Sequence, residues 1–197
     1  MEQHDRELIG AWRSGRADAA RELVRRHYPR MLGLCYRLTG SREPAEELTQ
    51  EVFVRLTRHV AAGTPIDNLE AWLHRTALNL WRDQARREIT AREKGITPSG
   101  GDEVIGRCPA PVGVEDTVMR DWLRDAVRRA VVGLSPPHRE VVVLHHYEGF
   151  TYAQIADLTG IPLGTVRSRL FHALRQLRDH LGPAAERGIE PWLNSVR

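Results

Sequence analysis

One stretch of this chain constrains its fold more than any other. Residues 151–181 read TYAQIADLTGIPLGTVRSRLFHALRQLRDHL, and their apolar residues recur at helical spacing on both sides of a short segment around Gly160. Glycine adopts backbone conformations that a Cβ would hinder, so a tight turn is expected there. The pattern predicts two helices joined by a turn, the arrangement that presents one helix to the major groove of DNA.

The second of these helices separates apolar from polar side chains. On a helical wheel, the apolar arc holds Val166, Leu170, Ala173, Leu174, Leu177 and Leu181. The opposite arc holds Arg167, Ser168, Phe171, His172, Arg175 and Arg178. Residues 163–178 contain no Asp or Glu, although a solvated helix face normally mixes both charge signs. Arginine suits phosphate oxygens and guanine edges, and an aromatic ring suits the thymine methyl group. The pattern therefore favours a DNA-reading helix over a helical hairpin with a solvated basic face.

The rest of the chain is also helical in pattern, and strand alternation is nearly absent. Between positions 95 and 113 the chain holds eight glycine and proline residues, which indicates a linker rather than a packed element. We therefore expect an all-α fold of two small helical domains joined by a flexible linker. The expected helices cover about residues 5–11, 17–38, 43–59, 69–87, 116–132 and 137–147, followed by the two helices of residues 151–181. The expected domains are residues 1–90 and 116–181, with the linker at 91–115 and a polar tail of unassigned role at 182–197.

Composition sets limits on compartment and partners. The formal net charge of +3 over 197 residues is too small to indicate nucleic acid, so that argument depends on where the arginines lie. The chain begins without an apolar run behind a basic patch, and it holds no apolar stretch of membrane-spanning length. Cys35 and Cys108 fit no metal-binding or redox spacing. We expect a cytoplasmic protein with no membrane insertion, no metal or other cofactor and no small-molecule substrate.

Two predicted helices of the first domain carry contrasting polar faces. The fourth places a polar stripe, Arg75, Asn79, Arg82 and Arg86, beside an apolar face, Leu69, Trp72, Leu73, Thr76, Ala77 and Leu80. The stripe suits a nucleic-acid backbone with a base edge nearby, although a solvated arginine face explains it equally well. The third begins with acidic and amide residues beside apolar ones, namely Glu46, Glu47, Gln50, Glu51, Val52, Phe53 and Leu56. Acid near a helix start complements the helix dipole, which is a sufficient structural explanation, and the functional alternative is a docking face for another protein.

Three segments are the most specific motifs of the chain. They read PAEELTQEVFVRL, EAWLHRTALNLWRDQARRE and LSPPHREVVVLHHYEGFTYAQIADLTGIPLGTVRSRL. The second contains the pattern N-x-x-x-D-x-x-R-R at Asn79, Asp83, Arg86 and Arg87. In this order, on either side of a linker, the three resemble the region 2 core-binding segment, the region 2 promoter-melting segment and region 4 of bacterial extracytoplasmic-function (ECF) RNA polymerase sigma factors. The resemblance covers about residues 5–181.

The resemblance implies a sigma factor that binds core RNA polymerase and directs promoter-specific transcription initiation, without catalytic residues of its own. It implies a four-helix, region 2-like domain that docks on the clamp helices of the β′ subunit and recognises and melts the −10 element of promoter DNA. There a base is expected to leave the stack and enter a protein pocket. It also implies a region 4-like helix-turn-helix domain that recognises the −35 element and meets the flap of the β subunit.

Site residues follow from the same resemblance. The implied polymerase-binding residues are Glu46, Glu47, Gln50, Glu51 and Phe53. The implied −10 residues are Thr64, Asp67, Asn68, Arg75, Asn79, Arg82 and Arg86. The implied −35 residues are Thr165, Arg167, Ser168, Arg169, Phe171, His172 and Arg175.

The chain departs from the family pattern at three of its positions. Pro44 stands where an acidic residue often opens the core-binding segment, and His172 and Leu174 stand where relatives commonly carry arginine. A neutral imidazole gives a weaker phosphate contact than a guanidinium group, so −35 affinity is expected to depend on pH or on other residues.

Like the ECF group, the chain lacks region 3. Because members of that group are often held by anti-sigma factors, the resemblance implies such a partner here.

Two other functions are compatible with parts of the sequence. A stand-alone repressor or a response-regulator output domain uses the same helix-turn-helix, but it needs a dimerisation face or a receiver domain, which the N-terminal half does not resemble. For an enzyme, a metal site could be sought at His138, His145, His146 and Glu148. However, His145 and His146 are expected to point about 100° apart on one helix and form no H-E-x-x-H pattern, so helix-surface histidines are the better interpretation.

Overall fold

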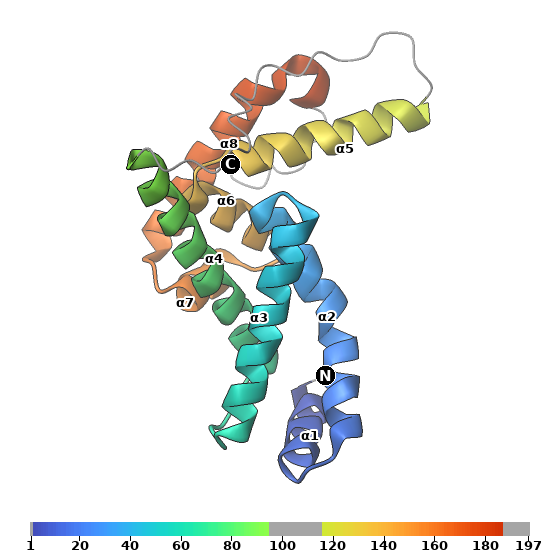
Figure 1. Cartoon of the computed structure of the whole chain (residues 1–197). Helices are drawn as coiled ribbons and strands as arrows, with labels where there is room; N and C mark the ends of the chain where they lie inside the picture. Colours follow the sequence, from blue (N-terminus) through green and yellow to red (C-terminus); the bar gives the residue numbers. More distant parts are fainter. Residues whose placement is uncertain (1, 95–115, 187–197) are drawn as a thin grey trace. The chain divides into compact units, whose positions relative to one another are not determined.

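The computed structural model describes residues 2–94 and 116–186 of the chain (Figure 1). Within these ranges every regular element is a helix and no strand occurs, which confirms the all-α fold. The chain divides into two compact units, residues 1–84 and 85–197. Of the predicted linker, 91–115, residues 91–93 are helical and residues 95–115 lie outside the described residues, as does the end of the predicted tail, 187–197.

Four helices build the N-terminal unit. They are α1 (Glu2–Arg13), α2 (Ala17–Thr39), α3 (Arg42–Ala61) and α4 (Leu69–Glu93), the last of which continues beyond residue 84. α2 and α3 lie side by side, and α1 packs against both (Figure 1). A leucine-rich core holds these helices together, with Leu23 and Leu34 of α2, Leu56 of α3 and Leu73 of α4 fully buried. Burial of each such side chain stabilises the fold by roughly 1.5–3 kcal/mol.

α4 is buried on two sides. Its predicted apolar face is confirmed at Leu69, Leu73 and Ala77, whereas Trp72, Thr76 and Leu80 are only half-buried. A second buried face, formed by His74, Leu78 and Trp81, was not predicted. The exposed side of this helix is therefore reduced to a narrow strip.

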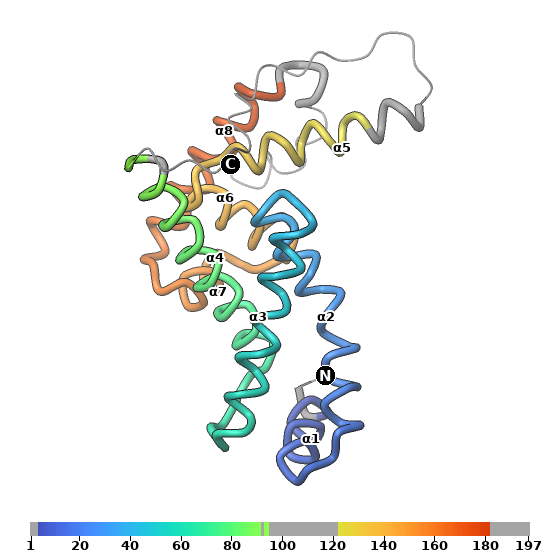
Figure 2. The backbone as a smooth tube through the Cα atoms, viewed as in Figure 1, coloured from blue at the N-terminus to red at the C-terminus, as the bar shows by residue number. Residues whose placement is uncertain are grey.

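The C-terminal unit is arranged around its last helix. The elements are α5 (Asp116–Gly133), α6 (Pro136–Val142), the π-helical turn η1 (Val143–Tyr147), α7 (Tyr152–Thr159) and α8 (Leu163–Glu186). α8 packs against α5, α6 and α7, and the backbone trace shows the short α7 leading through a tight turn into α8 (Figure 2). The predicted inner arc of α8 is confirmed, because all six residues are buried: Val166, Leu170, Ala173, Leu174, Leu177 and Leu181.

Both ends of α7 are closed by local interactions. At its start Thr151 and Gln154 form a capping box, in which the Gln154 amide donates to Thr151 Oγ1 at 3.3 Å and the Thr151 amide donates to Gln154 Oε1 at 2.9 Å. At its end Gly160 adopts a left-handed conformation with φ 72°, and its N–H donates to the carbonyl of Ala156 at 2.8 Å. The predicted turn at this glycine is therefore present.

Several predicted helix ends differ from the structure. α1 extends over Glu2–Arg13 rather than 5–11, α4 continues to Glu93, and α8 continues to Glu186 through the glycine and proline at 182 and 183. The predicted single helix at 137–147 is divided, because its second part is π-helical and the Glu148 N–H donates to the Val143 carbonyl, five residues back. Side-chain periodicity over one turn does not distinguish these two helix types.

Candidate nucleic-acid interfaces

The outer face of α8 is largely exposed, as expected of a surface that contacts DNA. Arg167, Ser168, His172 and Arg175 are exposed, and Phe171 has 55% of its surface accessible to solvent. Thr165 and Arg169, also predicted at this site, are half-buried at its edges. The buried arc beneath fixes the rotation of the helix, so these side chains face away from the unit.

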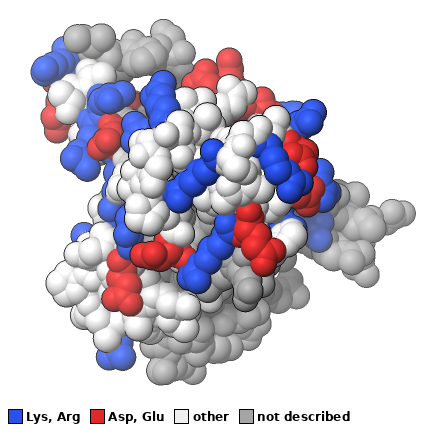
Figure 3. All heavy atoms as spheres, turned by 90° about the horizontal axis from the view of Figure 1, so that it is seen from below, with Lys and Arg blue, Asp and Glu red and all other residues white. Residues whose placement is uncertain are grey.

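Two features set this face apart from an ordinary solvated helix. An exposed phenylalanine keeps apolar surface in water, and here the Phe171 ring is 55% exposed and lies edge-on to the His172 ring, with centroids 5.6 Å apart. On the face drawn in Figure 3, acidic and basic side chains are interspersed. Residues 163–178 instead carry four arginines and no carboxylate. Such a surface can bind phosphate oxygens and read base edges.

The start of α8 is held in a fixed geometry. The carbonyl of Pro162 accepts hydrogen bonds from the amides of Thr165, at 2.8 Å, and Val166, at 3.1 Å. Ser168 Oγ donates to the Thr165 carbonyl at 3.1 Å. Together with the closed ends of α7, these contacts fix the direction in which the first turns of α8 project.

The histidines before α7 have structural partners. His145 Nδ1 donates to the Phe150 carbonyl at 2.8 Å, and its ring lies 4.8 Å from that of Tyr152. Burial, together with the neighbouring charge of His145, lowers the pKa of His146 to about 3, so this imidazole is neutral at physiological pH. His138 Nδ1 lies 3.2 Å from Gln176 Oε1 of α8. Within the described ranges no group of three or more His, Cys, Asp or Glu side chains is placed to hold a metal ion.

The polar stripe of α4 lies on the narrow strip left between its two buried faces. Arg75, Asn79 and Arg86 are exposed and Arg82 is half-buried. The segment before α4 carries the other predicted −10 residues, Thr64, Asp67 and Asn68, and all three are exposed. Asn68 also begins the helix, since its Oδ1 accepts the Ala71 amide at 2.8 Å.

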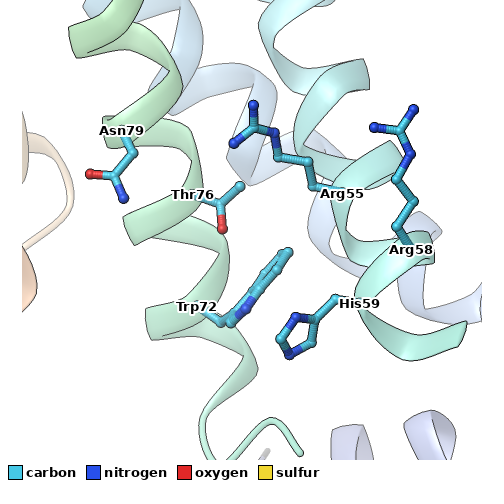
Figure 4. A pocket seen from close by; sticks show the side chains of 6 residues that line it. All are labelled: Arg55, Arg58, His59, Trp72, Thr76 and Asn79. Atoms are coloured by element: carbon cyan, nitrogen blue, oxygen red, sulfur yellow. The ribbon is translucent and has the colours of Figure 1, made fainter. Parts of the chain in front are cut away.

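A pocket of about 400 Å³ opens between α3 and α4 (Figure 4). Its lining residues are Arg55, Arg58 and His59 of α3 and Trp72, Thr76 and Asn79 of α4. The His59 and Trp72 rings lie at one end, with centroids 5.1 Å apart and planes tilted by 48°. The pocket thus combines aromatic surface, hydroxyl and amide groups that match a base edge, and guanidinium groups that match phosphate.

Sequence analysis missed the α3 half of this pocket. Asn79 was predicted there, but Arg55, Arg58 and His59 were not, because they belong to the helix that had been considered for protein docking. Their i, i+3, i+4 spacing is a usable signal, since it places three cationic or aromatic side chains on one helix face.

Only part of the acidic face of α3 is available to bind another protein. Glu46 pairs with Arg42 at 2.6 Å and Glu51 pairs with Arg55 at 2.9 Å, while Glu47 and Gln50 are exposed. Phe53, predicted with them, is only 8% exposed, because Tyr28 of α2 covers its ring at a centroid distance of 5.7 Å. Phe53 therefore supports this face from beneath and is not part of its accessible surface.

No helix in the described part of the chain is both long and apolar enough to cross a bilayer.

Family models match both units. The model of sigma-70 region 2 matches residues 23–89, and that of sigma-70, region 4 matches residues 124–177. The first therefore includes the pocket between α3 and α4, and the second includes α7 and most of α8.

Several sigma factors are similar to this chain in sequence. The ECF RNA polymerase sigma factor SigE of Mycolicibacterium smegmatis is 40% identical over 160 residues, which are 81% of this chain and 60% of that protein. The ECF RNA polymerase sigma factor SigL of Mycobacterium tuberculosis is 33% identical over 170 residues, 84% of this chain and 92% of that protein. The RNA polymerase sigma factor CarQ of Myxococcus xanthus is 32% identical over 176 residues, 87% and 94% of the two chains. The chain thus spans 60% of SigE but nearly all of the other two.

Two solved structures share the fold. The sigma factor RpoE, in complex with the anti-sigma factor NepR from Bartonella quintana, aligns with a TM-score of 0.59 at 24% identity, covering 81% of this chain and 94% of that one. CnrH, in complex with the cytosolic domain of CnrY, aligns with a TM-score of 0.60 at 22% identity, covering 89% and 96% of the two chains. At these identities the likeness concerns the fold alone.

Proposed function

Because this chain belongs to the ECF RNA polymerase sigma factors, we propose that its two units divide the reading of one promoter, with the C-terminal unit on the −35 element and the N-terminal unit on the −10 element. By family the protein directs promoter-specific transcription initiation and is an initiation factor rather than an enzyme. Its working compartment is therefore the cytoplasm, where RNA polymerase and promoter DNA are found.

The outer face of α8 is the proposed contact surface for the −35 element. It is exposed, free of acidic residues over residues 163–178, and includes the solvent-accessible ring of Phe171. Arg167 lies near the N-terminal end of α8, the part of a recognition helix that contacts base edges, and one bidentate contact to guanine is worth about 1–3 kcal/mol. Thr165, Ser168 and Arg175 are assigned to contacts with the flanking DNA.

The pocket between α3 and α4 supports recognition of an extruded −10 base. Taking a base out of the stack costs a few kcal/mol, and stacking on an aromatic side chain returns about 1–3 kcal/mol per base. Trp72 and His59 supply that aromatic surface, and Asn79 supplies an amide that can pair with a base edge. The strip on α4 with Arg75, Arg82 and Arg86, together with the exposed residues Thr64, Asp67 and Asn68, borders the path of the single strand.

The exposed part of the α3 face is the proposed polymerase-binding surface. Carboxylates repel DNA, so a partner at Glu47 and Gln50 is protein, and the family assigns this segment to the β′ subunit. The C-terminal unit is proposed to contact the β subunit. One aligned solved structure holds the sigma factor RpoE in complex with the anti-sigma factor NepR, and we extend that relationship to this chain as an anti-sigma partner.

Run-off transcription with core RNA polymerase tests the function directly. On a library randomised at both promoter elements, the wild-type chain is expected to yield transcripts from a defined subset of sequences. Asn79→Ala should reduce promoter opening, followed by permanganate reactivity of unpaired thymines, while binding to a −35 duplex is unchanged. Absence of promoter-directed transcripts, together with absence of a stable complex with core polymerase, would overturn the assignment. A stand-alone repressor would instead bind its duplex tightly without polymerase.

A further inference from the structure

Side chains of α1 form hydrogen bonds to the backbone of the segment between α3 and α4, residues 62–68. Arg6 donates from Nη2 at 3.0 Å and from Nε at 3.3 Å to the carbonyl of Asp67. Arg13 donates from Nη2 to the carbonyl of Thr64. Arg6 and Arg13 are seven residues apart and lie on the same face of α1, two turns from each other. One helix face therefore holds two points of the same segment.

α1 is itself anchored, so it can serve as a fixed support. Asp5 is 5% exposed, and its two carboxylate oxygens accept from Arg26 Nη1 at 3.0 Å and meet His27 Nε2 at 3.1 Å. Ile9, one turn further on, is also buried. These contacts attach α1 to the unit through side chains other than its two arginines.

Each end of the segment has its own contact, and the two arginines hold its backbone between those ends. At the α3 end Gly63 adopts φ 71°, and its N–H donates to Val60 O at 3.1 Å. At the α4 end Asn68 caps the helix. Between them, the carbonyls of Thr64 and Asp67 are the points held from α1. Since the contacts involve carbonyl oxygens, the side chains of these two residues remain exposed.

We infer that α1 is a positioning element for −10 recognition, in which Arg6 and Arg13 fix the backbone of residues 62–68 so that its exposed side chains meet the DNA strand in one geometry. The inference rests on the proposed −10 function of this unit. Fixing a residue's backbone costs about 1–2 kcal/mol, and a segment ordered before binding does not incur that cost when DNA arrives. Neither arginine needs to touch the DNA.

A double variant, Arg6→Ala with Arg13→Ala, tests this role in the full-length chain. The matched control is Arg21→Ala with Arg25→Ala, which removes two exposed arginines from α2. Three measurements are made: amide hydrogen exchange of the peptide covering residues 62–68, transcription with core polymerase on a −10 library, and affinity for a −35 duplex. In the test variant, exchange in this peptide should rise roughly tenfold, and discrimination among −10 bases should fall roughly tenfold. The control variant should resemble the wild type.

Each alternative has a distinct outcome. If the arginines act as direct phosphate contacts, the double variant lowers binding to all −10 sequences equally, with an altered salt dependence and unchanged base preference, and the inference fails. Unchanged exchange at residues 62–68 also overturns it. Should the double variant unfold α1, the single variant Arg6→Ala, which keeps the Asp5 anchor and the Arg13 contact, decides by the same readouts. A wild-type chain that initiates no transcription refutes the proposed function instead, whereas a failed inference leaves it standing.

Discussion

Gly160, at the turn between α7 and α8, allows the cost of a backbone conformation to be separated from the cost of a steric clash. Its φ of 72° and ψ of 17° lie in the left-handed region, and a Cβ built on it meets no heavy atom within 4 Å. Substitution by alanine therefore creates no overlap, and only the intrinsic strain of an L-residue in this region remains. That strain is roughly 1–2 kcal/mol for most residues and smaller for asparagine, whose side chain tolerates the conformation.

The expected result is a graded loss of stability. Gly160→Ala should reduce the free energy of unfolding by about 1 kcal/mol, and Gly160→Asn by less than half of that. Urea unfolding followed by circular dichroism measures this, and anisotropy of a labelled −35 duplex measures binding. Under conditions in which both variants are fully folded, their affinity for the −35 duplex should change by less than about twofold. The backbone hydrogen bond from residue 160 to the Ala156 carbonyl can form with alanine or asparagine at this position. Equal losses for alanine and asparagine, or a loss above about 3 kcal/mol for alanine, would refute the argument.

Three further substitutions probe the other surfaces. Arg167→Ala should weaken −35 binding by about 1–3 kcal/mol and relax the preference at one base pair, as a systematic duplex series would reveal. Glu47→Arg should lower affinity for core polymerase roughly tenfold, measured by competition. Folding lowers the pKa of His146 from its ordinary 6.5 to about 3. As the pH falls from 7 toward 3, the unfolded chain therefore binds a proton before the folded chain does, and the free energy of unfolding decreases. Between pH 7 and 5 the free energy of unfolding should fall by about 1 kcal/mol, allowing for the partial exposure of His146. In urea unfolding, His146→Gln should make the free energy of unfolding less dependent on pH.

Each of these three predictions has a control variant or an outcome that would contradict it. Arg178→Ala, three turns beyond Arg167 on α8, should weaken binding to all duplexes alike, and an unaltered base preference in Arg167→Ala would remove that residue from base reading. Glu7→Arg makes the same charge change on α1 and should leave polymerase competition intact. A pH dependence shared by wild type and His146→Gln would assign the acid sensitivity to another group.

Features set by local periodicity were predictable from the sequence. The burial of the six inner residues of α8 and the exposure of Arg167, Phe171 and Arg175 follow from a 3.6-residue repeat that needs no knowledge of neighbouring helices. The turn at Gly160 was predictable for a different local reason, because glycine adopts the left-handed conformation more readily than other residues.

Features set by tertiary contacts were not. The pocket depends on the end of α3 meeting the first turns of α4, and nothing near His59 in the sequence points to Trp72. Phe53 was assigned to the docking face by the family resemblance, but Tyr28 of α2 covers its ring. Likewise, nothing near Asp5 in the sequence indicates its burial, since its partners Arg26 and His27 lie on another helix. Each case involves residues whose environment is decided by a different element.

The backbone attachment of residues 62–68 has a practical consequence for protein engineering. A support that grips carbonyl oxygens is indifferent to side-chain identity, so this stretch behaves as an interchangeable cassette. Transplanting the equivalent stretch from a paralogue, with the left-handed glycine and the capping Asn68 retained, should retarget the chain to a different start-site sequence without rebuilding the helices around it.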